Sequence, residues 1–367
     1  MQQNRSVSTP ITSLIHKAIE RDGGWLPFDR FMALALYAPG LGYYASHKPV
    51  FGMLPGSGSD FVTAPELSPL FGAALAHQLA QALAASGCDE IWEFGAGSGA
   101  LAAQLLVALG DQVRSYTIVE LSGSLRERQR TRLAERAAKL RWADVLPPSM
   151  QGVLVGNEVL DAMPVRLLHF DGARWLERGV VAAQGGFAWR DRPTGLHPSW
   201  PGPYEAGYVT EIHPQAEAFI TTLAERLTRG AAFFIDYGFP EAEYYHPQRS
   251  GGTLMCHRAH RADADPLADV GDKDITAHVN FSGIALAAQH AGLDVLGYTT
   301  QAHFLMNCGV LDLLAGADIR LIANTQKLLT EHEMGELFKV IGFAKGCDAA
   351  FTAAPSGFAQ GDRTHTL

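Results

Sequence analysis

Short apolar runs alternate with helical patterns in the middle of the chain, between residues 90 and 158. The first run, at 90–94, is followed by a glycine-rich turn at 95–99, and apolar residues then recur at helical spacing over 100–109. A strand, a glycine turn and a helix in this order form a nucleotide-binding unit. The pattern therefore predicts an α/β fold.

Each of the four apolar runs in this region ends in an acidic residue. These residues are Glu93, Glu120, Asp144 and Glu158. The carboxyl ends of parallel strands meet at one edge of a sheet, so the four side chains would form a row where open α/β folds bind ligands. Any one of them could instead be a solvated strand end or a helix cap. Together with the glycines, they predict a ligand site.

The glycine turn suits two classes of cofactor. Gly95, Gly97 and Gly99 lack a Cβ atom, so their backbone can turn tightly and press against a ligand. The same spacing also satisfies the loose dinucleotide fingerprint. Glu93 would repel an anionic pyrophosphate but not the sulfonium and amino groups of S-adenosylmethionine. The sequence therefore favours S-adenosylmethionine over a nicotinamide dinucleotide.

The ends of the second and third strands predict further contacts to this cofactor. Glu120 can accept hydrogen bonds from both ribose hydroxyls, and we expect the adjacent Leu121 to contact the cofactor as well. Asp144 would lie within reach of the adenine amino group.

The remaining patterns give an expected organisation of the chain. Helical stripes begin at Ile11 and after Pro27, short strands are expected over 165–210, and a long polar stretch follows Asp236. The expected parts are an amino-terminal helical region with cofactor-covering loops at 1–88, a core at 89–300 with insertions at 165–210 and 237–281, a helical region at 301–346 and a flexible tail at 347–367.

Composition narrows the class of protein. The chain has 367 residues, of which 47% are hydrophobic, and a net charge of −9, which argues against nucleic acid as a partner. Its four cysteines are far apart and form no C-x-x-C pair, as is typical of reduced thiols in the cytoplasm. No apolar run reaches 18 residues, and no signal or transit segment is evident at the amino terminus. We therefore expect a cytoplasmic protein of bacterial type that does not insert into a membrane.

Four longer segments resemble the signature blocks of a known family. They are YAPGLGYY at 37–44, DFVTAPELSP at 60–69, GNEVLDAMP at 156–164 and DITAHVNF at 274–281. In this order they are similar to the MidA-like methyltransferases, a family that includes mitochondrial assembly factors of respiratory complex I. The resemblance implies a class I, Rossmann-like methyltransferase sheet with helices on both faces. It also implies methylation of arginine on a respiratory-complex subunit, and it suggests that Thr63 and Glu66 fold back over the cofactor.

The segment after the fourth strand supplies the candidate catalytic residues. Methyl transfer is an in-line displacement that needs an aligned nucleophile, and a protonated guanidinium must be held by carboxylates. We assign Glu158 to bind the guanidinium and Asp161 to a second role. Asn157 could hold the substrate or the methionine moiety. Alternatively, Asn157 is a helix cap and Asp161 an acid in the first helical turn.

Three other features each have two explanations. The pattern Cys256-His257-x-x-His260 could bind a metal, but no second ligand pair has reliable spacing, so we expect no metal and interpret 246–265 as a polar substrate loop or lid. His278 is either a contact to the substrate or a buried, hydrogen-bonded histidine. Asp236 and Tyr237 could wall the cleft or form an ordinary turn.

Three functions remain open on this evidence. The first is protein arginine methylation, with a subunit of a respiratory quinone oxidoreductase as the protein substrate. The second is methylation of a small molecule, and the third is assembly of a partner by a protein that binds S-adenosylmethionine without turnover. A nicotinamide oxidoreductase is the least favoured alternative. A homodimer could form through the amino-terminal helices.

Overall fold

The computed structural model describes residues 9–46, 62–258 and 261–367, and an eight-stranded sheet forms its centre. Its strands are β2 (Glu90–Phe94), β3 (Ser115–Val119), β4 (Leu140–Ala143), β5 (Met150–Asn157), β10 (Leu227–Phe239), β14 (Val279–Asn280), β15 (Asp294–Thr300) and β16 (Phe338–Lys345). The order is β15-β16-β10-β5-β2-β3-β4, with β14 paired to β10. β16 runs antiparallel to both of its neighbours, and the pairs among β10, β5, β2, β3 and β4 are parallel. The predicted fold class is confirmed.

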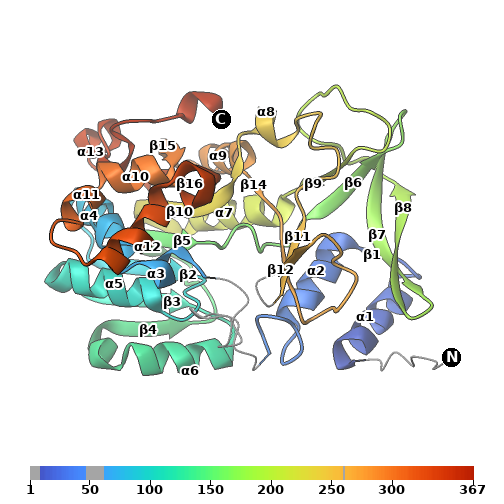
Figure 1. Ribbon diagram of the computed structural model, residues 1–367, viewed down its shortest axis with the longest axis horizontal. Helices are drawn as coiled ribbons and strands as arrows, with labels where there is room; N and C mark the ends of the chain where they lie inside the picture. The colour runs from blue at the N-terminus through green and yellow to red at the C-terminus, as the bar shows by residue number, and fades with distance from the viewer. Residues whose placement is uncertain (1–8, 47–61, 259–260) are drawn as a thin grey trace.

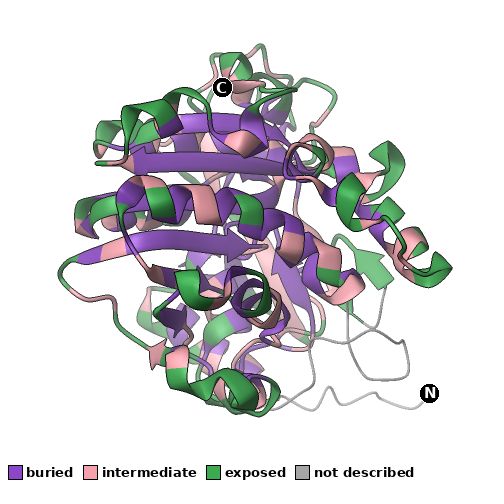
Figure 2. Cartoon of the chain, turned by 90° about the vertical axis from the view of Figure 1, so that its left-hand side faces the viewer, coloured by how far each residue is buried: buried purple, intermediate pink, exposed green. Residues whose placement is uncertain are grey.

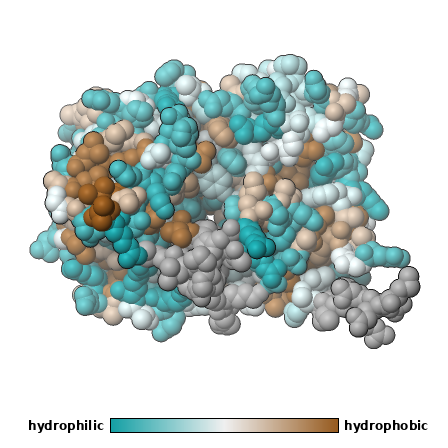
Figure 3. Space-filling view, viewed as in Figure 1, coloured by the Kyte–Doolittle hydropathy of each residue, from teal (hydrophilic) through white to brown (hydrophobic). Residues whose placement is uncertain are grey.

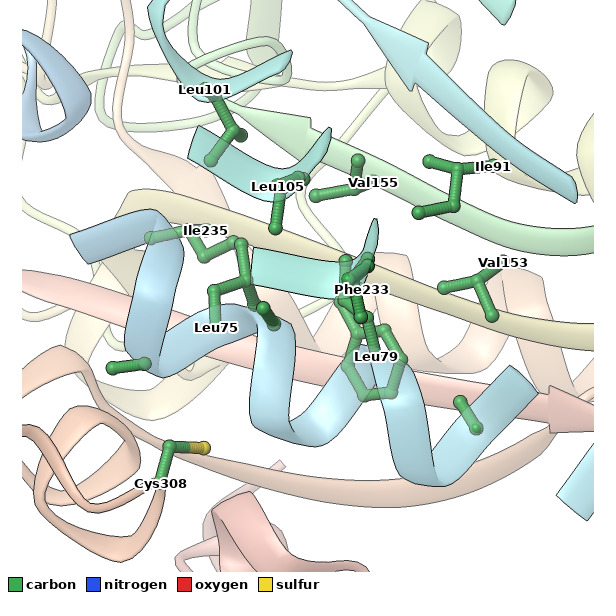
Figure 4. Packing of buried hydrophobic residues seen from close by; sticks show 14 of the residues in the cluster. Leu75, Leu79, Ile91, Leu101, Leu105, Val153, Val155, Phe233, Ile235 and Cys308 are labelled. Carbon is green, nitrogen blue, oxygen red and sulfur yellow. The ribbon is translucent and has the colours of Figure 1, made fainter. Parts of the chain in front are cut away.

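Helices cover both faces of this sheet (Figure 1). One face carries α4 (Pro69–Ser86) and α5 (Ala100–Leu109), and the other carries α7 (Pro214–Arg226) and α9 (Phe281–His290). In Figure 4, Leu75 and Leu79 of α4 point toward Ile235 and Phe233 of β10. The central strands are therefore buried on both sides (Figure 2), which explains their unbroken apolar sequences.

A separate antiparallel sheet forms from strands of the first insertion and one short strand near the amino terminus. It contains β1 (Leu26–Pro27), β6 (Arg166–Phe170), β7 (Trp175–Ala183), β8 (Gly186–Pro193) and β9 (Val209–Ile212). The helices α1 (Pro10–Arg21) and α2 (Phe28–Tyr37) share its hydrophobic cluster. The short strands expected over 165–210 are confirmed.

The amino-terminal region expected at 1–88 does not form one unit. Whereas α1 and α2 pack with the antiparallel sheet, α3 (Ala64–Leu67) and α4 pack on the central sheet. The reason is that α4 carries apolar side chains that the central strands bury.

The region expected to be helical at 301–346 begins with helices but ends in a strand of the central sheet, so the prediction was wrong for its last part. It begins with α10 (Gln301–Asn307), α11 (Val310–Leu313), α12 (Ile319–Leu329) and a π-helical turn, η4 (Glu331–Gly335). β16 then inserts between β10 and β15, and its residues Val340 to Ala344 are buried. A short strand of this kind derives its stability from neighbours distant in sequence, which local periodicity does not reveal.

The tail at 347–367 is packed, so the prediction of a flexible tail was also wrong. It forms α13 (Ala349–Ala353) and the 3₁₀ turns η5 (Ser356–Phe358) and η6 (Thr364–Thr366). Phe358 is 5% exposed and lies against Gly297, where an added Cβ would come within 2.4 Å of the phenyl ring. Arg363 binds Glu336 at 2.6 Å. This buried ring and this ion pair are among the contacts that join the tail to the core.

The second insertion, within 237–281, forms α8 (Glu241–Tyr244) and a three-stranded sheet. That sheet contains β11 (Met255–Arg258), β12 (Arg261–Asp263) and β13 (Asp274–Thr276), with β11 in the middle. In the described part of the chain, no helix is long and apolar enough to cross a bilayer.

Exposed apolar side chains gather on the helices that precede β16. Five of the ten large hydrophobic residues that are exposed in the described structure lie there, namely Met306, Leu311, Leu313, Ile319 and Leu337. A brown patch marks this surface near α11 in Figure 3. We refer to these five residues as the carboxy-terminal apolar patch.

Candidate active site

One cavity of about 1140 Å³ lies at the carboxyl edge of the central sheet. Its walls come from the ends of β2, β3, β5 and β10, from α2 and the segment after it, from the second insertion, and from Met334 to Phe338. This volume slightly exceeds the usual range of ligand pockets, about 300–1,000 Å³. The cavity therefore has room for a cofactor and part of a second substrate.

The glycine turn forms one end of the cavity. Gly95 and Gly97 line it, with φ angles of 64° and 52°. At Gly95 an added Cβ would lie 2.7 Å from Cγ2 of Val159, so both space and backbone conformation require glycine. Gly99 is not among the lining residues; with φ of 83° it precedes the first turn of α5.

The carboxylate at the end of β3 is held in place and lines the cavity. Glu120 accepts hydrogen bonds from the Ser122 amide at 2.8 Å and from Nε2 of Gln129 at 3.3 Å. Burial raises its pKa. The neighbouring Leu121 is 77% exposed and also lines the cavity. This arrangement is suited to binding the hydroxyl groups of a ribose and one face of an adenine ring.

Glu93 is more deeply buried than its position at a strand end suggested. It is 2% exposed and accepts a hydrogen bond from the Tyr116 hydroxyl at 2.7 Å. Burial raises the pKa of Glu93 to about 8, with a smaller contribution from Glu120. A cationic ligand beside Glu93 would favour the ionised form and lower this pKa.

The structure does not bring Asp144 to the cavity. Asp144 follows β4, is exposed and is not a lining residue, so its contact with adenine stays a prediction. Thr63 does line the cavity, just before α3. Glu66 binds Ser98 of the glycine turn and Arg132, whose Nη1 lies 2.5 Å from Oε1. The segment from Thr63 to Glu66 thus lies against the glycine turn; Asp60 and Phe61 of the same block lie outside the described residues.

Asp236 holds the candidate catalytic loop after β5 through the backbone amides of that loop. Its Oδ2 atom accepts hydrogen bonds from the backbone amides of Val159, Leu160 and Asp161 at 3.1, 2.8 and 3.2 Å. Sequence reasoning expected Asp236 to wall the cleft or to form an ordinary turn. Asp236 is fully buried, so its side chain does not face the cleft. Its hydrogen bonds to the three amides order the loop instead. Glu158 enters this loop with φ of 55°, a left-handed conformation unusual for a residue with a side chain.

The loop presents two polar oxygen atoms that lack a partner within the described structure. These are Oδ1 of Asn157 and Oδ1 of Asp161, and both residues line the cavity. Nδ2 of Asn157 donates to Oε1 of Glu158 at 2.9 Å. Burial raises the pKa of Glu158 to about 8, with a smaller contribution from Asp161, and raises that of Asp161 to about 6. Buried acceptors without donors are costly, so the site favours a ligand that carries several N–H groups.

Three further residues complete the site, although sequence reasoning gave them no role. The Tyr44 hydroxyl lies 2.9 Å from both carboxylate oxygens of Asp274, and the Tyr37 hydroxyl donates to the Ala162 carbonyl at 2.8 Å. The two tyrosine rings stack at 5.6 Å. The residues lie in two blocks that carried the family resemblance, but neither periodicity nor spacing indicated that they would meet.

The cavity is acidic. Its carboxyl groups are Glu93, Glu120, Glu158, Asp161 and Asp274. Among the described residues that line it, none is an arginine or a lysine. A concentration of carboxyl groups in a partly apolar cavity favours a cationic ligand.

The possible metal site is only partly described. Cys256 is buried in β11 and His257 lines the cavity, but His260 lies outside the described residues. Within 9–46, 62–258 and 261–367, no three histidine, cysteine or acidic side chains are grouped as metal ligands would be.

Comparison with known proteins identifies the family. A family model described as "Putative S-adenosyl-L-methionine-dependent methyltransferase" matches residues 74–299. The chain belongs to this methyltransferase family. A protein from Burkholderia thailandensis, whose crystal structure has S-adenosyl-homocysteine bound, is 50% identical in sequence to this chain. The two structures superpose with a TM-score of 0.94, and the match covers 100% of this chain and 99% of that one.

Two named relatives are more distant in sequence. Protein arginine methyltransferase NDUFAF7, mitochondrial, of Xenopus tropicalis is 25% identical over 98% of this chain and 91% of its own length. The homolog from Caenorhabditis elegans is 26% identical over 79% of this chain and 74% of its own.

The cofactor of this methyltransferase is S-adenosyl-L-methionine, and the residues present fit it. The turn at Gly95 has no space for a side chain, and Glu120 offers a carboxylate to hydroxyl donors. Oδ1 of Asn157 is a buried acceptor without a hydrogen-bond donor within the described structure. The predicted cofactor is thereby confirmed, whereas the role of each residue stays a prediction.

Proposed function

We propose that this methyltransferase modifies arginine side chains of a protein substrate. The observation that carries the proposal is the acidic cavity, in which Glu158 and Asp161 face no lysine or arginine among the described lining residues. A guanidinium carries five N–H donors and a fixed positive charge. It would satisfy Oδ1 of Asp161, which has no partner within the described structure, and would favour ionised Glu158.

Two further observations support this proposal. The relatives named protein arginine methyltransferase match along most of this chain. Leu337, one of the five residues of the carboxy-terminal apolar patch, also lines the cavity. A protein substrate would lie across that surface, because exposed apolar patches are typical of protein contacts. From the family resemblance, we propose a subunit of a respiratory quinone oxidoreductase of complex I type as that protein.

Transfer of labelled methyl groups to arginine-containing and lysine-containing peptides tests the proposal. We expect methylarginine in the hydrolysed product, identified by mass spectrometry. Glu158→Gln should lower kcat by roughly a hundredfold because it removes a charged contact to the guanidinium, whereas affinity for S-adenosylhomocysteine should change less than threefold. Glu135→Gln, at an exposed position outside the cavity, is the matched control.

Other outcomes would favour the alternatives. Transfer only to small acceptors would identify a small-molecule methyltransferase. Binding of S-adenosylhomocysteine without transfer to any acceptor, together with partner assembly that survives Glu158→Gln, would identify an assembly factor that binds the cofactor without turnover.

A further inference from the structure

The His278 side chain lines the cavity and packs against two aromatic rings. Its ring stacks on Phe239 at 5.3 Å with an angle of 10° between the planes, and it meets the edge of Tyr237 at 5.0 Å. The His278 backbone amide donates to Oγ1 of Thr253 at 3.0 Å. These contacts leave the imidazole little rotational freedom, as a group that acts on a substrate requires.

The hydrogen bonds of His278 define its tautomer. Nδ1 lies 3.4 Å from the Thr253 carbonyl oxygen, which can only accept, so Nδ1 carries the proton. Nε2 then keeps its lone pair. No hydrogen bond to Nε2 is formed within the described structure, and Nε2 is not one of its fully buried, unpartnered polar atoms. The lone pair is thus accessible at a residue that lines the cavity.

The surroundings keep this imidazole neutral. Burial lowers the pKa of His278 to about 4, so the ring is uncharged at physiological pH. Glu158 and Asp161 line the same cavity as His278 and are suited to hold a guanidinium as carboxylates. If either took up a proton, it would lose its ion pair with the substrate. A neutral histidine can accept a proton and leave both ion pairs intact.

We propose that Nε2 of His278 accepts the proton that the substrate nitrogen loses, which would make His278 a catalytic residue. This inference rests on the proposed function. When bound, S-adenosylmethionine supplies a methyl group whose bond to sulfur breaks, with the electron pair left on a now neutral sulfur, as the bond to the arginine nitrogen forms. The N–H bond breaks and the proton moves to Nε2, so the imidazolium replaces the lost sulfonium charge and the net charge of the cavity is unchanged. His278 later releases the proton to water.

Steady-state kinetics of His278→Gln test this role, with the full chain and an arginine peptide that the wild type methylates. Glutamine keeps a polar side chain but cannot accept a proton. We expect kcat to fall by about a hundredfold or more, with KM and affinity for S-adenosylhomocysteine within threefold of wild type. Added imidazole should restore part of the rate of a folded His278→Ala variant. His290→Gln, exposed on α9, is the control and should match wild type.

The inference would be overturned by wild-type kcat in His278→Gln, by a loss confined to KM or cofactor affinity, or by a folded His278→Ala variant that imidazole does not activate. If the wild-type protein binds S-adenosylhomocysteine but methylates no arginine, the proposed function fails first and the inference fails with it.

Discussion

At the scale of single residues, Asp236 connects the stability of the fold to the order of the site. One buried carboxylate oxygen accepts three consecutive backbone amides of the loop that carries Asp161. Without it, those amides would be buried without partners, at a cost of about 1–3 kcal/mol for each fully unsatisfied group.

We therefore expect Asp236→Ala to lower the free energy of unfolding by on the order of 3 kcal/mol and to abolish methyl transfer. Asp236→Asn, which keeps one carbonyl oxygen as an acceptor, should lose less. Urea unfolding with matched activity assays measures both effects. Equal stability of the alanine and asparagine variants would contradict this role for the carboxylate.

Buried carboxyl groups with raised pKa values also predict how stability depends on pH. Glu93 and Glu158 titrate near 8 in the folded chain, compared with a reference value of 4.5. Between these values the folded state binds more protons than the unfolded state, so stability falls as pH rises, by up to about 1.4 kcal/mol per pH unit for each group. Glu93→Gln should flatten the decline in unfolding free energy between pH 5 and 8, measured in urea without cofactor. A wild-type stability that rises over this range would contradict the expectation.

At the scale of elements, the sequence predicted what depends on local pattern. The turn at Gly95 and the ends of β3 and β5 were located because glycines and apolar runs stand together in the chain. β16 and the packed tail were missed, because their partners Gly297 and β10 are distant in sequence. Tyr44 and Asp274 meet across 230 residues, and no spacing rule connects them.

The packed tail gives a prediction at this scale. Phe358→Ala should lower the free energy of unfolding by about 3 kcal/mol, because a buried aromatic ring leaves a cavity when it is removed. Gly297→Ala should also destabilise, since its new methyl group would collide with the ring. Chemical denaturation of each variant provides the measurement. Wild-type stability of Phe358→Ala would indicate that the tail is not docked in solution.

At the scale of the whole molecule, the cavity lies between separately packed parts. Two hydrophobic clusters flank the central sheet, and a third joins α1 and α2 to the antiparallel sheet. The cavity takes Glu120 from the central sheet and Tyr37 from α2. A ligand bound there contacts both parts and should stabilise them together.

S-adenosylhomocysteine at a hundred times its Kd should raise the free energy of unfolding by about 2.7 kcal/mol. Glu120→Ala should lose most of this stabilisation at the same ligand concentration, whereas Glu135→Ala should keep it. Thermal unfolding with and without the ligand measures the difference. Equal stabilisation of both variants by the ligand would show that Glu120 does not contribute to cofactor binding.

The backbone of Glu158 has a consequence for the engineering of this scaffold. Its φ of 55° is a conformation that glycine adopts freely and that costs other residues about 1 kcal/mol. Glycine at this position would relax the loop and raise thermal tolerance while deleting the carboxylate. Directed evolution that selects only for heat resistance would therefore tend to discard the chemistry, so a library built on this chain needs turnover as a second criterion.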